Sequence, residues 1–162
     1  MVGARAHDRR LALLLALFLA LALSLFAVTA QTAREKAGHF DVMSLSAVNT
    51  QGAPVRLRVE VADTPDKRAL GLMFRRHLPQ GHGMLLRWRE PRRVAIWMKN
   101  TFIALDIIFI DAQGRVIAVH EGAKPHDRTL IPSRRPVIAV LELAAGEARR
   151  LKLLPGARIS LP

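Results

Sequence analysis

Short runs of branched apolar residues, separated by turn-forming residues, constrain the fold of this chain more than any other feature. The segment VRLRVEV alternates Val55, Leu57, Val59 and Val61 with charged residues, which is the pattern of a half-buried strand. Further runs rich in branched residues predict five more strands; they are GMLLRW from Gly83, VAIWM from Val94, DIIFI from Asp106, RVIAVHE from Arg115 and VIAVLEL from Val137. The loop DAQG at 111–114 joins two of these runs and ends on a glycine, as a hairpin loop requires.

One helix interrupts this pattern in the segment DTPDKRALGLMFRR. Thr64 is suited to the N-cap position and Pro65 to the first helical residue. Three apolar residues would share the helix face that packs on the sheet: Leu70, Met73 and Phe74. Gly71 would lie inside this helix. We therefore expect a mainly β (α+β) fold, a small and mostly antiparallel barrel-like domain with one short helix packed on it.

The N-terminal segment predicts an export signal. MVGARAHDRR carries three arginines and is followed by the apolar run LALLLALFLALALSLF at 11–26, which is the layout of a secretory signal peptide. Val28 and Ala30 place small side chains where a signal peptidase reads them, so cleavage is expected after Ala30. The protein would then be exported, in the periplasm. The alternative is an uncleaved N-terminal helix that anchors the chain, because residues 11–30 reach the ~20 residues that a membrane span requires.

These features divide the chain into a signal peptide at 1–30, a linker or edge segment at 31–54 with weak periodicity, and a single β-rich domain at 55–162. The chain contains no cysteine. Disulfides and thiolate metal sites are therefore excluded, and the core alone must stabilise the exported domain.

The formal net charge of +12 indicates attraction to anionic partners. Nucleic acid is not expected as a partner, because the chain is predicted to be exported and has two tryptophans and no tyrosine with which to stack bases. Contact with a membrane is expected only through the signal segment or the surface charge. The oligomeric state stays open.

The segments RALGLMFR, GHGMLL, IWMKNTFIALDIIFI, GRVIAV and VLELAAG follow one another in this order. With them, the chain from Val55 to the C-terminus resembles the domain of unknown function 192 family, and WMKNT followed by Leu105 and Asp106 is the most specific part of the likeness. The resemblance implies a compact β-rich domain, often exported, with no established reaction or ligand. The chain departs from the family pattern at Ala104, where a proline is usual, and near Lys152, where a glycine is missing.

Polar residues stand within the otherwise apolar stretch IWMKNTFIALDIIFI. If VAIWM and DIIFI are neighbouring strands, their connection brings Lys99, Asn100 and Thr101 to the end of the sheet that holds Asp106. A buried carboxylate needs a partner, and Lys99 or Arg75 could neutralise it. In one alternative Asp106 accepts backbone N–H groups and locks the loop. In the other, a pocket for an anionic or sugar-like envelope ligand is formed by Arg75, Trp97, Lys99, Asn100, Thr101 and Asp106.

Glu142 leads to the one catalytic hypothesis. If Glu142 approaches Asp106, the two carboxyl groups could act as general acid and base on a glycosidic or ester bond. The favoured alternative is an outward-facing Glu142 in a surface ion pair.

No metal site or cofactor is expected, since the histidines lack metal-binding spacing and the methionines are suited to the core. We thus expect a non-enzymatic binding or interaction module. The alternatives are a hydrolase of envelope polymers that uses the carboxylate pair, and a structural, electropositive partner of membrane or polymer surfaces.

Overall fold

The computed structural model describes residues 39–162, so the predicted signal at 1–30 and part of the predicted linker lie outside the described residues. Seven strands form one sheet in the order β6-β5-β8-β3-β2-β1-β9, in which only β2 and β3 are parallel neighbours. The strands are β1 (Asp41–Val48), β2 (Pro54–Ala62), β3 (His82–Arg92), β5 (Leu105–Ile110), β6 (Val116–Ala123), β8 (Val137–Ala144) and β9 (Arg158–Ser160). The predicted mainly β, mostly antiparallel architecture is confirmed.

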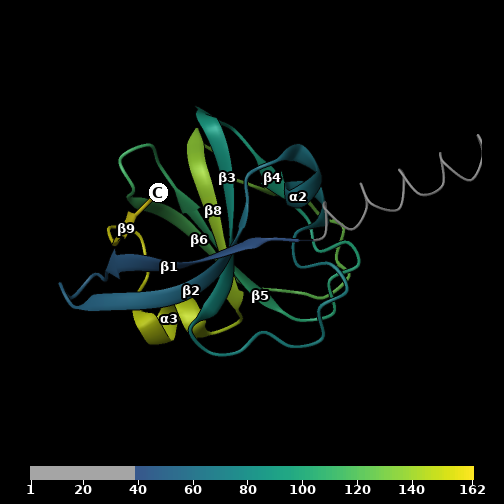
Figure 1. Ribbon diagram of the computed structural model, residues 1–162, viewed down its shortest axis with the longest axis horizontal. Helices are drawn as coiled ribbons and strands as arrows, with labels where there is room; N and C mark the ends of the chain where they lie inside the picture. The colour runs from purple at the N-terminus through teal and green to yellow at the C-terminus, as the bar shows by residue number, and fades with distance from the viewer. Residues whose placement is uncertain (1–38) are drawn as a thin grey trace, which may run out of the picture. The chain divides into compact units, whose positions relative to one another are not determined.

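The sheet curls, so that β1 and β2 cross in front of β3 and β8 in Figure 1. The strands β6 and β9 lie at the two edges of the sheet. An isolated bridge between Arg115, just before β6, and Arg158 of β9 links these two edges. The result is a half-barrel with an inner and an outer face.

Each face of the sheet carries its own hydrophobic core because side chains alternate along the strands. The inner core includes Leu57 of β2, Ile108 of β5 and Leu141 of β8. The outer core includes Ile107 of β5 and Val140 of β8. The central strands β5 and β8 are therefore almost entirely buried, which matches their nearly continuous apolar sequences.

The predicted helix is α2 (Pro65–Leu70), which begins as expected because the hydroxyl of its N-cap Thr64 accepts the N–H of Lys67 at 3.2 Å. The helix ends earlier than expected. Gly71 is not inside the helix but caps it with φ 48°, in the left-handed region that favours glycine. The expectation that Phe74 packs on the sheet was wrong, since Phe74 is exposed, and Leu72 enters the outer core instead.

A second helix, α3 (Glu147–Leu151), was not predicted. It follows β8 directly, and Ala148 packs into the inner core. A helix of five residues is too short to show the periodicity by which helices are recognised in sequence.

The segment VAIWM does not join the main sheet. Only Ala95 and Ile96 form a strand, β4 (Ala95–Ile96), and this strand pairs with β7 (Ile131–Pro132) in a separate two-stranded sheet. The expected pairing of VAIWM with DIIFI was therefore wrong. By contrast, the hairpin loop at 111–114 forms as expected, with Gly114 at φ 73°.

The compact unit described here begins at Phe40. β1 pairs with β2 on one side and with β9 on the other, so residues 41–48 of the predicted linker or edge segment form a strand of the sheet. None of the helices described between residues 39 and 162 has the length and apolar character to cross a bilayer.

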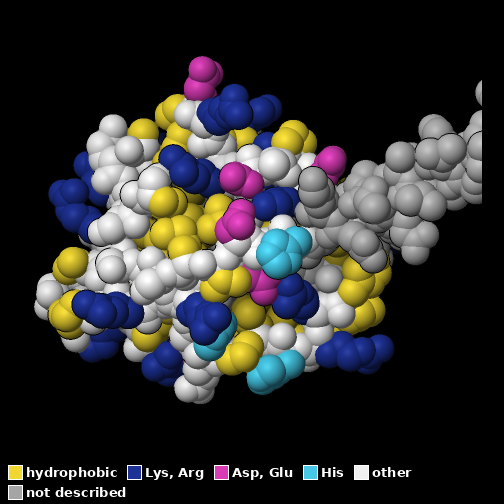
Figure 2. Space-filling view, in the orientation of Figure 1, with side chains coloured by type: hydrophobic (Ala, Val, Ile, Leu, Met, Phe, Trp, Pro, Cys, Tyr) yellow, Lys and Arg dark blue, Asp and Glu magenta, His cyan; other side chains and the backbone are white. Residues whose placement is uncertain are grey.

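Lysine and arginine side chains are spread across the face shown in Figure 2. Acidic side chains lie near the centre of this face, between the basic ones. The positive charge on this face is therefore distributed and does not form one continuous patch.

Candidate functional site

The turn from Met98 to Thr101 is held between two other loops. The Thr101 N–H bonds to the Met98 carbonyl at 3.2 Å and closes the turn, in which Asn100 adopts φ 56°. The Asn100 carbonyl accepts the N–H of Phe74, and the Thr101 carbonyl accepts the N–H of His126. These backbone bonds fix the turn between the segment after α2 and the loop after β6.

A cavity of about 220 Å³ opens beside this turn, and we call it the tryptophan pocket. Its lining comes from α2 and the residues after it, from β3, β4, β5 and β8, and from the turn itself. The lining residues that carry aromatic, charged or hydroxyl groups are Arg68, Trp88, Trp97, Lys99, Thr101 and Glu142.

Glu142 is the one carboxylate that lines the pocket among residues 39–162. It lies in the middle of β8, between Met84 of β3 and Ile107 of β5, and is 5% exposed. In the described part of the chain the Glu142 carboxyl group accepts no hydrogen bond, and its oxygens open to the pocket, since no fully enclosed side-chain oxygen there lacks a partner. Burial raises the pKa of Glu142 to about 7. The expectation of an outward-facing surface ion pair was wrong, because Glu142 is buried on a face of the sheet that the segment from Arg68 to Met73 and the Met98 to Thr101 turn cover.

Two cations lie over the two tryptophans of the pocket. The Arg68 guanidinium carbon is 5.2 Å from the ring centre of Trp88, and the Lys99 Nζ is 5.2 Å from that of Trp97. Both distances are in the range of cation–π attraction. Trp97 is 45% exposed, so its ring forms an accessible wall of the pocket.

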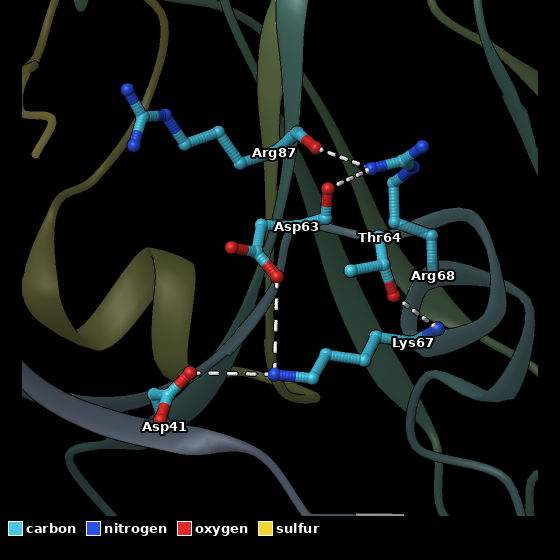
Figure 3. Close-up of polar contacts among 6 residues, drawn as sticks. All are labelled: Asp41, Asp63, Thr64, Lys67, Arg68 and Arg87. Carbon is cyan, nitrogen blue, oxygen red and sulfur yellow. Dashed lines mark hydrogen bonds and ion pairs between the residues drawn. The ribbon is translucent and has the colours of Figure 1, made fainter. Parts of the chain in front are cut away.

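Backbone carbonyls hold Arg68 in this position. Its Nη1 donates to the carbonyl of Asp63 at 2.7 Å and to that of Arg87 at 2.8 Å, as Figure 3 shows. The neighbouring Lys67 forms ion pairs with Asp41 and Asp63. These contacts fasten α2 to the start of β1, the end of β2 and the middle of β3, and so they fix one wall of the pocket.

Asp106 lies elsewhere. It is fully buried, its Oδ1 accepts the N–H of Gly122 at 2.9 Å, and its Oδ2 accepts the N–H of Ala148 at 2.9 Å. The carboxylate therefore connects β5 to β6 and to the first turn of α3. These two bonds match the alternative in which Asp106 accepts backbone N–H groups and locks the structure.

Asp106 and Glu142 also lie on opposite faces of the sheet. The cross-strand partner of Glu142 on β5 is Ile107, and consecutive residues of a strand point to opposite faces. The structure does not bring the two carboxyl groups together, and the basis for a two-carboxylate hydrolase is lost.

The six residues predicted as ligand-binding are divided by the structure. Trp97, Lys99 and Thr101 line the tryptophan pocket. Asn100 contacts the Met73 sulfur with its side-chain amide at 3.9 Å. Arg75 forms an ion pair with Glu60 at 2.6 Å and does not line the pocket, and neither does Asp106.

Sequence reasoning missed two residues of this site. Trp88 and Arg68 were not predicted, because their positions on β3 and α2 meet the turn only in three dimensions. For Glu142 the sequence did contain a signal. A glutamate within the apolar run VIAVLEL is unusual, because Leu141 and Leu143 on either side of it are buried in the strand.

The profile of one protein family, DUF192, described as "Uncharacterized ACR", matches residues 46–161. The chain belongs to the DUF192 family. The resemblance inferred from the sequence is confirmed, and the match extends upstream of Val55 into β1, in agreement with the pairing of that strand. A comparison with curated proteins finds no match.

Two solved structures resemble this DUF192 chain. One, from Sinorhizobium meliloti 1021 and described provisionally as a transcription regulator, is 41% identical, with a TM-score of 0.73 over 75% of this chain and 94% of that one. The other, a protein of unknown function from Novosphingobium aromaticivorans DSM 12444, is 35% identical, with a TM-score of 0.73 over 76% of this chain and 88% of that one. The fold is thus shared with both proteins.

Proposed function

We propose that this DUF192 protein is an exported, non-enzymatic binding module that takes up a small sugar-like ligand in the tryptophan pocket. One observation carries the proposal: the largely buried carboxyl group of Glu142 opens to this pocket and accepts no hydrogen bond from residues 39–162. Hydrogen bonds to an ionised carboxylate are stronger than neutral ones, and more so where the surroundings are apolar. A ligand that donates hydrogen bonds to Glu142 in this pocket would gain such bonds on binding.

The pocket combines flat apolar walls with few polar groups, which suits a polyhydroxylated ring. Trp88 and Trp97 offer aromatic surface to the C–H faces of such a ring. Glu142 and Thr101 offer oxygens to its hydroxyl groups. The volume of about 220 Å³ is below the roughly 300–1,000 Å³ of sites for drug-sized ligands, which favours a single ring or one end of a chain.

The charges of the pocket favour a neutral sugar over a simple anion. Above pH 7 the carboxyl group of Glu142 is largely ionised and repels an anionic group at the same depth. Lys99 and Arg68 lie over the tryptophan rings, where they could contact a negatively charged substituent that projects from the ligand. An acidic sugar is therefore compatible with the site, whereas a bare phosphate or carboxylate fits it poorly.

Binding without catalysis is supported by the composition of the pocket. Glu142 is its one carboxylate in the described part of the chain, so the lining lacks the second carboxyl group that glycoside cleavage usually requires. The regulator description applies to the Sinorhizobium protein, and the likeness to that protein supports only a shared fold.

Titration of the intrinsic tryptophan fluorescence tests this proposal. The probes are N-acetylglucosamine and glucose as neutral sugars, glucuronate as an acidic sugar, and acetate as a simple anion. We expect saturable quenching by at least one sugar, its loss in Trp97→Leu, and at least tenfold weaker binding in Glu142→Gln. The control Glu121→Gln changes an exposed carboxylate far from the pocket lining and should bind as the wild type does.

Two outcomes would contradict the proposal. The first is the absence of a saturable response to every sugar. The second is binding that Trp97→Leu leaves intact and that disappears at high ionic strength. The second outcome would favour an electropositive surface as the functional feature, since salt screens exposed charges more strongly than a pocket.

A further inference from the structure

A second cavity lies beside the edge strand β6, and we call it the β6 groove. Its volume is about 650 Å³, roughly three times that of the tryptophan pocket. It lies between β6 and the segment that leads through β7, and its apolar lining comprises Met98, Phe109, Ile117, Ala118, Val119, Ala123, Leu130, Ile131 and Pro132. Leu130 is 60% exposed, which is unusual for a large aliphatic side chain.

The polar lining of the β6 groove is mostly basic. Lys124, Arg134, Arg135 and His120 contribute to it, and Asp127 is the one acidic residue of the lining among residues 39–162. The carboxylate of Asp127 accepts the N–H of Thr129 at 2.8 Å within its own loop. No ion pair involves Lys124, Arg134 or Arg135 in the described part of the chain.

We infer that the β6 groove binds a single-chain anionic amphiphile of the fatty-acid class. The apolar lining would contact the acyl chain and remove its methylene groups from water. The unpaired basic side chains of the rim would attract the acidic head group. This site is independent of the tryptophan pocket, because Met98 is the one described residue that lines both cavities.

An anionic amphiphile explains both properties of the groove together. A sugar would leave the apolar lining in contact with polar groups, and a neutral hydrocarbon would leave the basic rim without a partner. The groove is a cavity and not a flat surface, which favours a monomeric ligand over the surface of a bilayer.

Isothermal titration calorimetry of the full chain with decanoate tests the inference. Decanol and acetate serve as matched probes that lack the charge and the chain, respectively. We expect decanoate to bind at least tenfold more tightly than decanol, and acetate not to bind. The double variant Arg134→Glu and Arg135→Glu should weaken decanoate binding at least tenfold and leave decanol binding unchanged, whereas Leu130→Asp should weaken the binding of both.

The control is Arg56→Glu with Arg58→Glu on β2. These arginines are exposed and do not line the groove, so the same change of net charge should leave decanoate binding unchanged. Thermal unfolding of each variant checks that it is folded. The inference is overturned if decanoate shows no saturable binding, if binding persists in both groove variants, or if the chain binds anionic phospholipid vesicles but not monomeric decanoate.

Discussion

Asp106 and Glu142 lie on adjacent strands but on opposite faces of the sheet, because Glu142 is paired with Ile107. Their environments differ accordingly. Asp106 accepts two backbone N–H groups in the inner core. Glu142 lies in the outer core, open only to the tryptophan pocket, and accepts no hydrogen bond from the described residues. One carboxylate has the contacts of a structural residue, and the other lines the pocket to which we assign ligand binding as a proposal.

Asp106→Asn should destabilise the protein without changing ligand binding. The carboxamide places an N–H₂ group against one of two backbone donors, so at least one bond to an ionised acceptor is lost, at a cost of about 1.5–3 kcal/mol. Urea denaturation measures this loss of the free energy of unfolding. Glu121→Gln, at an exposed ion pair, is the control and should cost less than about 1 kcal/mol. A stability equal to that of the wild type would contradict the role of Asp106 as a lock.

Glu142 should make the stability of the protein depend on pH. Its pKa rises from 4.5 in the unfolded chain to about 7 in the folded one, so between these values the folded state binds more protons. The wild type should therefore lose stability as the pH rises from 4.5 through 7, by about 3 kcal/mol. In Glu142→Gln the side chain does not titrate, so the variant lacks this pH-dependent contribution to the unfolding free energy. The difference in unfolding free energy between the two proteins, measured from pH 4 to 8, should show this slope, and a flat difference would refute it.

Gly83 permits the close approach of β3 and β8 that places Glu142 beside the pocket. A Cβ at this position would lie 2.6 Å from the Glu142 carbonyl oxygen and 2.6 Å from a methyl group of Leu143. Gly83→Ala should therefore cost about 1–3 kcal/mol through overpacking. Gly83→Val should cost more than Gly83→Ala, because its additional methyl groups enter the same crowded space beside Glu142 and Leu143. Equal losses in the two variants, measured by chemical denaturation, would contradict the steric argument.

Lys152 occupies a backbone conformation that favours glycine. It caps the C-terminus of α3 at φ 57°. A non-glycine residue there costs roughly 1–2 kcal/mol. Lys152→Gly should be more stable than Lys152→Ala by about 1 kcal/mol, because both variants lose the side-chain contact with Gln51 and only the alanine keeps the strain. Equal thermal stabilities of the two variants would refute this.

Most of the fold could be predicted from the sequence. The alternation in VRLRVEV and the branched runs of β3, β5, β6 and β8 predicted these strands, because local propensity and tertiary structure agree there. The helix start at Thr64 was predicted from its capping side chain. The end of α2 was not, because Gly71 is compatible with both a helix interior and a cap.

Only part of the candidate site could be predicted from the sequence. Trp97, Lys99 and Thr101 were predicted from their position in an apolar stretch, and they do line the pocket. Asp106 was wrongly grouped with them, because the pairing of VAIWM with DIIFI was assumed. The actual pairing of β4 with β7 depends on residues 35 positions further along the chain, as in the contact of Ile96 with Ile131. Pairing over such distances leaves no local signal in one sequence.

The titration of the Glu142 carboxyl carbon by ¹³C NMR, assigned by comparison with Glu142→Gln, tests the central claim most directly. A buried carboxyl group that opens only to the tryptophan pocket should titrate with a pKa of about 7. A titration near 4.5, the ordinary value for glutamate, would show that Glu142 is hydrated or paired, and would contradict the proposed binding site.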